Sequence, residues 1–133
     1  MQVLCVANVS LCSALTTLIP SSCQSKKAAH LSLQVYKILL GATAVVQPVS
    51  CDEAFLDVTG LGDPEVTART IRADILRETG CTASAGISHN MLLARLATKA
   101  GKPDGQYRLE PDQVGSWPTP SQSHCSTSLE GWL

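Results

Sequence analysis

The sequence AVVQPVSCDEAFLDV, residues 44–58, contains two apolar, β-rich runs with a polar interruption between them. The first run is residues 44–49 and the second is residues 54–58. Runs of this composition, separated by a few polar residues, predict two strands joined by a turn. The interruption is Ser50-Cys51-Asp52-Glu53, so two adjacent carboxylates are expected at the end of a strand.

Outward from this pair of strands, the pattern predicts alternating helices and strands. Asp63 and Pro64 are typical of a helix start, and Gly80 is typical of a helix end. The other elements are expected from helical spacing or from short apolar runs. In order, we expect a helix over 30–40, strands over 44–49 and 54–58, a helix over 64–79, a strand over 82–87, a helix over 90–100 that Ser88 can cap, and a strand over 106–109. This order predicts an α+β domain with helices on one face of a mainly antiparallel sheet.

The composition limits what such a domain can do. The chain has 133 residues, a formal net charge of −1 and a hydrophobic fraction of 44%. The length allows one ordinary domain or part of a larger one. The charge excludes a strongly basic domain that binds nucleic acid by bulk electrostatics alone. The hydrophobic fraction is too high for a wholly disordered chain.

Charge is concentrated in the middle of the chain. Residues 35–112 hold eighteen of the twenty-one charged residues. We therefore expect a globular domain over 35–114, a poorly defined leader over 1–34 and a disordered Ser/Pro-rich tail over 115–133. The leader is apolar from Val3 to Ile19, but polar residues interrupt it and no cation precedes it. We expect neither a membrane span nor a secretory signal there.

Six cysteines are scattered without a C-x-x-C pair or a zinc-type spacing with histidine. This pattern favours free thiols in a reducing compartment. Cys51 and Cys81 are expected to be small buried side chains. A small secreted protein with disulfide bridges remains an alternative.

Asp52 and Glu53 are the first candidates for chemistry, because hard carboxylate oxygens suit Mg²⁺. An acidic pair in an exposed hairpin is the plainer interpretation of the same residues. Lys102 lies in a turn with proline and glycine, and it is a candidate phosphate contact. Arg95 and Lys99 are further phosphate candidates, or simply a solvated helix face. A Ser/His/Asp set, a glycine-rich phosphate loop and an HExxH motif are all absent from the sequence.

Two stretches together resemble the palm of Y-family translesion DNA polymerases, the UmuC-like palm. They are VSCDEAFLDVT at residues 49–59 and SAGISHNMLLARLATKAGKPDGQY at residues 84–107. The Ser-Cys-Asp-Glu form and the Met-Leu-Leu-Ala-Arg form at residues 91–95 are most similar to the deoxycytidyl-transferase branch. The resemblance covers about residues 35–114, and it implies a partial palm with a ferredoxin-like sheet.

The resemblance implies Mg²⁺-dependent nucleotidyl transfer to a DNA primer during damage bypass, with two metal ions. Asp52 would bridge both ions, Glu53 would hold the ion nearer the primer terminus, and Lys102 would contact the triphosphate. Ser50 would lie near the primer backbone, and Arg95 and Lys99 would contact DNA or phosphate. The implied partners are primer-template DNA, a dNTP (dCTP by branch) and replication or repair proteins, with no membrane. A nuclear location follows from the resemblance alone.

The sequence also departs from this family. No Asp or Glu precedes Asp52, whereas the family's first palm strand carries another Asp that bridges both metals. Fingers, thumb and little-finger segments are not matched. We therefore expect a truncated palm, an alternatively spliced or mispredicted product, that is inactive in isolation. A non-catalytic DNA-repair interaction module is the main alternative. A nucleotidyl cyclase shares the general topology, but the Lys-Pro-Asp-Gly turn favours the polymerase.

Overall fold

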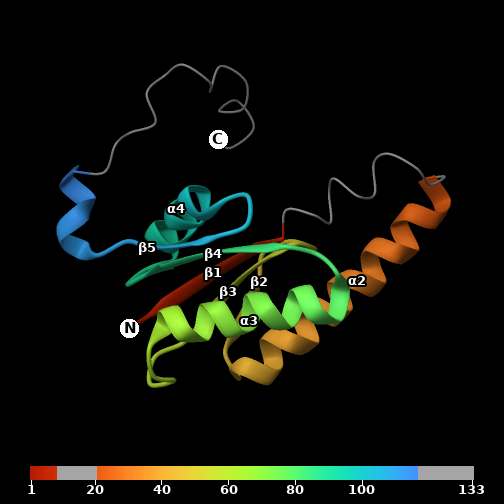
Figure 1. The fold of residues 1–133 in the computed structure, drawn as a ribbon, viewed down its shortest axis with the longest axis horizontal. Coiled ribbons are helices and arrows are strands. Elements are labelled where there is room, and N and C mark those ends of the chain that lie inside the picture. Colours follow the sequence, from red (N-terminus) through yellow and green to blue (C-terminus); the bar gives the residue numbers. More distant parts are fainter. Residues whose placement is uncertain (9–20, 117–133) are drawn as a thin grey trace, which may run out of the picture.

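The computed structural model describes residues 1–8 and 21–116 of the chain (Figure 1). Its elements, in chain order, are β1 Val3–Asn8, α2 Ser21–Ala42, β2 Val46–Pro48, β3 Glu53–Asp57, α3 Pro64–Thr79, β4 Ala83–Ser88, α4 Met91–Gly101, β5 Gln106–Arg108 and the 3₁₀ helix η1 Pro111–Ser116. Every element that the sequence predicts between residues 30 and 109 is present, with α2 starting earlier than expected. The α+β fold class is therefore confirmed.

The five strands form one sheet in the order β2-β3-β1-β4-β5. β1 is antiparallel to both β3 and β4, and β2 is antiparallel to β3. Only β4 and β5 are parallel, and α4 makes the crossover between them. The sheet is therefore mainly antiparallel, as the sequence predicts.

The structure differs from the expected leader over residues 1–34, because β1 occupies the centre of the sheet and α2 begins at Ser21. Leu4 and Cys5 are 0% exposed, on opposite faces of the strand. A strand covered on both faces has a continuous apolar run rather than an alternating one, so its pattern does not distinguish it from other buried segments. The domain limits at residues 35 and 114 stay predictions, and the tail from residue 117 lies outside the described residues.

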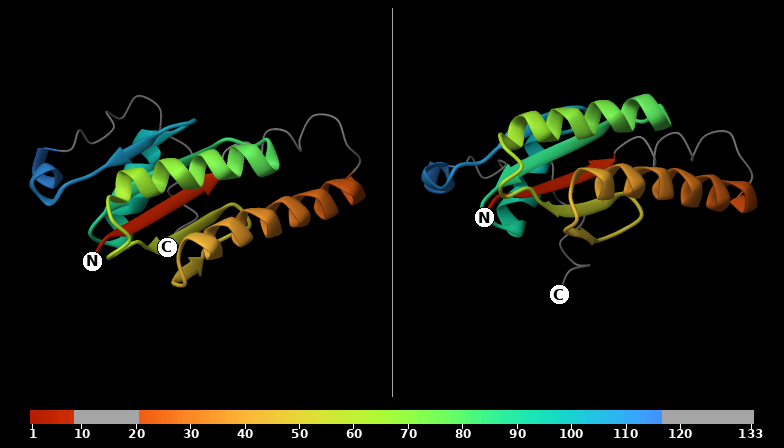
Figure 2. Two further views of the ribbon diagram at one scale, coloured as in Figure 1. Left: turned by 60° about the horizontal axis from the view of Figure 1, so that its bottom comes forward. Right: turned by 90° about the horizontal axis from the view of Figure 1, so that it is seen from below.

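Helices cover both faces of the sheet, which corrects the expectation of a single helical face (Figure 1). Figure 2 shows α2 and α3 side by side in front of the strands. α2 and α3 pack on one face, where Leu39, Ile71 and Ile75 meet Leu4 and Leu56 of β1 and β3. α4 packs on the other face and contacts β4, β1 and β5. Apolar residues on both sides of β1 require this second cover, since exposing either side would leave apolar surface in water.

Gly86 of β4 lets α4 approach the sheet closely. A Cβ atom built at this position would lie 2.1 Å from the Ala94 carbonyl oxygen and 2.2 Å from the Thr98 nitrogen, both backbone atoms of α4. Ala94 and Ala97 are 0% exposed, so small side chains also face the sheet from the helix. The distance between α4 and β4 therefore depends on the missing side chain.

The ends of α3 and α4 follow from local chemistry. Asp63 caps α3 by accepting a hydrogen bond from the Glu65 nitrogen, and Gly80 ends it with φ 69°. Asn90 caps α4 by accepting from the Leu93 nitrogen, rather than Ser88 as expected. Ser88 is buried, and its hydroxyl donates to the Leu109 carbonyl. A buried serine satisfied in this way is not free to cap a helix.

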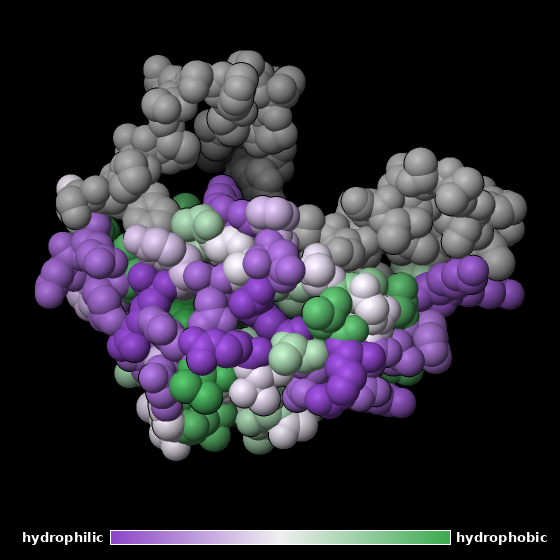
Figure 3. Space-filling view, in the orientation of Figure 1, coloured by the Kyte–Doolittle hydropathy of each residue, from purple (hydrophilic) through white to green (hydrophobic). Residues whose placement is uncertain are grey.

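The surface in Figure 3 is largely hydrophilic, with smaller hydrophobic patches between the polar side chains. Among residues 1–8 and 21–116, no helix is long and apolar enough to cross a membrane.

Replacing Gly86 with Ala should destabilise the chain by about 2–3 kcal/mol, because the added methyl group meets backbone atoms that cannot move independently. Gly41→Ala is the matched control. Nothing lies within 4 Å of a Cβ atom there, and the residue is in α2. The control should stabilise the chain by about 0.5 kcal/mol. Urea unfolding followed by circular dichroism measures both, and equal effects would contradict the close approach of α4.

Candidate functional site

The predicted site residues gather at one end of the sheet because of strand direction. β3 begins at Glu53, and this residue pairs with Ala7 near the end of β1. β4 begins beside the same end of β1, where Asn8 pairs with Ala83. β5 runs parallel to β4, so the turn containing Lys102 also precedes its strand at this end. The turn that contains Asp52 and Glu53 (the acidic turn) and the turn that contains Lys102 (the Lys102 turn) therefore lie at the same end of the sheet, with β1 and β4 between their strands.

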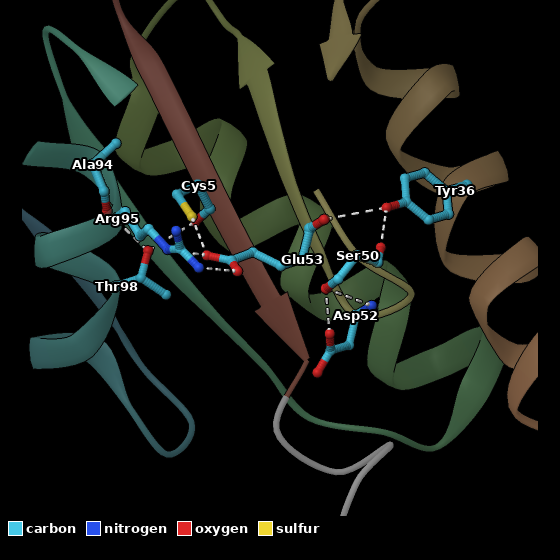
Figure 4. Close-up of polar contacts among 8 residues, drawn as sticks. All are labelled: Cys5, Tyr36, Ser50, Asp52, Glu53, Ala94, Arg95 and Thr98. Carbon is cyan, nitrogen blue, oxygen red and sulfur yellow. Dashed lines mark hydrogen bonds and ion pairs between the residues drawn. The ribbon is translucent and has the colours of Figure 1, made fainter. Parts of the chain in front are cut away.

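Asp52 and Glu53 have different partners (Figure 4). The Ser50 hydroxyl donates to Asp52 Oδ1 at 2.6 Å, and the Asp52 nitrogen donates back to Ser50 Oγ at 3.4 Å. The Glu53 side chain extends across β1 toward α4 and meets Arg95. The two carboxylates are adjacent in sequence, but they do not converge on one point.

Arg95 engages both carboxylate oxygens of Glu53. Its Nε lies 2.9 Å from Oε1, and its Nη2 donates to Oε2 at 2.9 Å. The Glu53 side chain is 17% exposed and that of Arg95 is 34% exposed, so water only partly screens the pair. Two parallel hydrogen bonds of this kind fix the direction of both side chains, and they tie α4 to β3.

Cys5 lies beneath this ion pair. Its thiol donates to Glu53 Oε1 at 3.7 Å, and its carbonyl accepts from the Thr98 hydroxyl at 3.3 Å. Burial raises the pKa of the Cys5 thiol to about 11, and the nearby Glu53 carboxylate acts in the same direction.

Cys51, by contrast, is exposed, which corrects the expectation that it is buried; it lies in the turn rather than in a strand. Cys81 is buried as expected.

The residues at this site do not fit a pair of Mg²⁺ ions. Ala7 stands opposite Glu53, so the described part of β1 contributes no carboxylate. Among residues 1–8 and 21–116, no three His, Cys, Asp or Glu side chains gather to hold a metal. Glu53 is already paired with Arg95, and Asp52 is left as one accessible hard ligand. Two ions bridged by shared carboxylates need more donors than this.

The turn that contains Lys102 is held by Arg72 of α3. Arg72 Nε donates to the Ala83 carbonyl at 2.8 Å, and Nη2 donates to Asp104 Oδ1 at 2.9 Å. The Ser84 hydroxyl donates to the Pro103 carbonyl at 2.9 Å. The Lys102 side chain is exposed beside this fixed backbone, so its ammonium group is available to an anion.

Of the remaining candidates, Arg95 is the ion-pair partner of Glu53, while Lys99 is exposed in the last turn of α4. Sequence reasoning missed Tyr36, whose hydroxyl donates to backbone carbonyls, and Arg72, whose partners are a backbone carbonyl, a carboxylate and an amide distant in sequence. No local pattern identifies such partners. A groove of about 850 Å³ between α2 and α3 contains none of the candidate residues.

This fold, with acids at one end of a central sheet, is that of a polymerase palm. It is similar to the insertion ternary complex of Dbh DNA polymerase, with a TM-score of 0.72 and 18% identity over 87% of this chain and 51% of that one. DinB from Sulfolobus solfataricus gives a TM-score of 0.69 at 18% identity, covering 87% and 50%. At such identity, these likenesses show the fold alone.

Sequence comparison gives the family. The impB/mucB/samB family model matches residues 6–99, and the chain belongs to this family. It is 54% identical over 83 residues to DNA repair protein REV1 of Arabidopsis thaliana, which covers 61% of this chain and 8% of that protein. DNA polymerase IV of Shewanella pealeana is 41% identical over 104 residues, covering 75% and 28%. The resemblance to Y-family polymerases is confirmed, and the chain spans less than a third of either relative.

Breaking the ion pair should destabilise the fold. Arg95→Met leaves a half-buried Glu53 carboxylate without its cation, and a double-mutant cycle with Glu53→Gln should give a coupling of about 1–2 kcal/mol. The pair of Asp74 and Arg77 on α3 is the control, because its side chains are 32% and 68% exposed, and we expect a coupling below about 0.5 kcal/mol there. Urea unfolding of the four variants of each cycle measures both couplings. Equal values would show that partial burial does not strengthen the Glu53 pair.

The buried thiol predicts a loss of stability in alkali. The pKa of Cys5 is about 11 in the fold against 9.0 for an unperturbed cysteine thiol, so the native state binds the proton more tightly. This contribution is fully present below pH 9 and is lost as pH rises toward 11. Between pH 8 and 10.5, wild type should lose about 2 kcal/mol more than Cys5→Ala does. Cys51→Ala, which alters an exposed thiol, should behave like wild type. Parallel pH profiles for all three proteins would contradict the buried Cys5.

Proposed function

We propose that the chain provides the palm of a translesion DNA polymerase, which transfers a deoxynucleotide, with dCTP preferred, to a DNA primer. One observation carries the proposal: the turn with Asp52 and Glu53 lies at the same sheet end as the turn with Lys102. Carboxylates and an exposed lysine at one end of a sheet suit a site that handles a triphosphate and a primer end. The similarity to a DNA repair protein of Arabidopsis thaliana supports a role in DNA repair, while the dCTP preference and a nuclear location are carried by the family resemblance alone.

The side chains divide the work by charge. Lys102 presents a compact cation for the triphosphate, because a lysine ammonium group acts as a point charge. Asp52 is the carboxylate that stays accessible, and Ser50 orients it. Glu53 would act as the second acid, and Arg95 and Lys99 of α4 would contact DNA or phosphate. A divalent metal ion would supply charge neutralisation for the triphosphate, and Asp52 would hold it only together with a further carboxylate.

The described residues, on their own, are proposed to be inactive. The acid set is incomplete and Glu53 is neutralised by Arg95, so metal-dependent transfer needs a further carboxylate. The same observation favours a second candidate function, a non-catalytic module that binds DNA-repair partners. Primer extension by the purified chain with Mg²⁺ or Mn²⁺, each dNTP supplied separately, distinguishes the two. Extension that vanishes on Asp52→Ala would exclude the non-catalytic module.

A chimaera tests the catalytic proposal itself. Residues 46–108 would replace the matching segment of Arabidopsis REV1, where the surrounding protein supplies the missing parts. We expect primer extension that favours dCTP, is lost on Asp52→Ala with Glu53→Ala, and weakens on Lys102→Ala. The chimaera carrying Arg69→Ala, which removes an exposed cation of α3, is the matched control and should extend the primer as the unmodified chimaera does. A folded chimaera without extension would refute the proposed roles of these residues.

Adding a carboxylate on β1 should create a metal site. Ala7 and Glu53 pair directly in the antiparallel register, which places their Cβ atoms about 4.5–5.5 Å apart. Ala7→Asp should bind Mn²⁺ at least about tenfold more tightly than wild type, because the added charge exceeds what Arg95 neutralises. Electron paramagnetic resonance of free Mn²⁺ measures the binding. Ala7→Asn, with the same shape and no charge, is the control; equal binding by both variants would contradict a carboxylate site.

A further inference from the structure

The turn with the two acids is held from one side by hydroxyl groups of α2. The Tyr36 hydroxyl donates to the Ser50 carbonyl at 2.6 Å and also lies 3.2 Å from the Glu53 carbonyl (Figure 4). The Ser32 hydroxyl donates to the Cys51 carbonyl at 2.7 Å. Ser32 and Tyr36 are one helical turn apart, so they lie on the same face of α2. Three of the four carbonyls in the turn therefore meet a hydroxyl group of this helix.

The turn has its own hydrogen bonds, and these complete the arrangement. The nitrogens of Val49 and Ser50 donate to the Glu53 carbonyl at 2.9 and 3.1 Å. With the backbone fixed at both ends, the Ser50 hydroxyl is in place to hold Asp52 Oδ1 at 2.6 Å. The direction of the Asp52 carboxylate thus depends on the turn, and the turn depends on α2.

These hydroxyl groups are separable from the packing of α2 in the core. Val35 and Leu39 anchor the helix and are 5% and 1% exposed, whereas Ser32 and Tyr36 are only half-buried. The Tyr36 ring packs beside the core cluster, and phenylalanine would keep that ring. Removing either hydroxyl therefore changes the support of the turn and leaves the apolar contacts in place.

We propose that Ser32 and Tyr36 are positioning residues, which set the direction of the Asp52 carboxylate through the backbone of residues 50–53. The role of Asp52 in binding rests on the proposed function. The ordering of residues 50–53 by Ser32 and Tyr36 does not, and it can be tested separately. It assigns to α2 a role at the site that is additional to covering the sheet.

Amide hydrogen exchange followed by NMR tests the proposal on the full chain. Tyr36→Phe and Ser32→Ala should each make exchange at Val49 and Ser50 about 5–10-fold faster relative to exchange in β1. Ser32→Thr, which keeps a hydroxyl group, should restore slow exchange. Tyr107→Phe is the matched control, because it removes a tyrosine hydroxyl on β5 at the far edge of the sheet. If exchange rises equally in the turn and in β1, the hydroxyl groups stabilise the fold only, and the proposal is wrong.

Mn²⁺ binding connects the turn to the site. In the Ala7→Asp background, adding Tyr36→Phe should weaken Mn²⁺ binding about 3–10-fold, whereas adding Tyr107→Phe should not change it. Equal Mn²⁺ affinity with and without Tyr36→Phe would overturn the positioning role. If Ala7→Asp itself binds no Mn²⁺, the proposed metal-dependent function fails, and the exchange ratio still decides whether α2 orders the turn.

Discussion

The backbone pairing of β1 with β3 on one side and β4 on the other is the interaction on which the rest of the structure depends. Val3 to Ala7 pair with β3, and Val3 to Asn8 pair with β4. Without β1, the β2–β3 hairpin and the β4-α4-β5 unit would share no strand ladder. A two-stranded hairpin is marginal by itself in water. The acidic turn and the Lys102 turn lie at the same end of one sheet only because β1 joins the β2–β3 hairpin to the β4-α4-β5 unit.

Local signals in the sequence were enough to predict the elements from residue 30 to residue 109. Helical spacing, Asp63 with Pro64, and Gly80 mark α3 directly, and the polar interruption at residues 50–53 marks the β2–β3 turn. β1 was missed because a strand buried on both faces lacks alternation. The position of α4 was missed for a related reason. Its approach depends on Gly86, and an absent side chain gives no periodic pattern that indicates a helix above it.

Only those residues of the candidate site that belong to a sequence motif could be predicted. The spacing of Asp52, Glu53 and Lys102 indicates chemistry through resemblance to a family, and their catalytic roles stay predictions. Tyr36 and Arg72 could not be found in this way, because each acts on carbonyls that only the folded chain brings near. A tyrosine at helical spacing is most simply interpreted as a core residue. Its hydroxyl group has meaning only once the turn lies beside α2.

The Glu53–Arg95 ion pair and the lack of a carboxylate on the described part of β1 act together, because both lower the negative charge at this end of the sheet. Gly86 lets α4 come close enough for Arg95 to reach Glu53 across β1. Ala7, the β1 residue opposite Glu53, carries no charge, so Arg95 has one carboxylate to neutralise. The Glu53–Arg95 pair therefore leaves no excess negative charge. Asp52 then stands alone, which is too little charge to hold two divalent cations. A carboxylate added on β1 would share the Arg95 guanidinium with Glu53. One negative charge would then be left uncompensated, and this charge would attract a metal ion. The same close packing that stabilises the fold therefore neutralises Glu53 and leaves Asp52 as the uncompensated carboxylate of the turn.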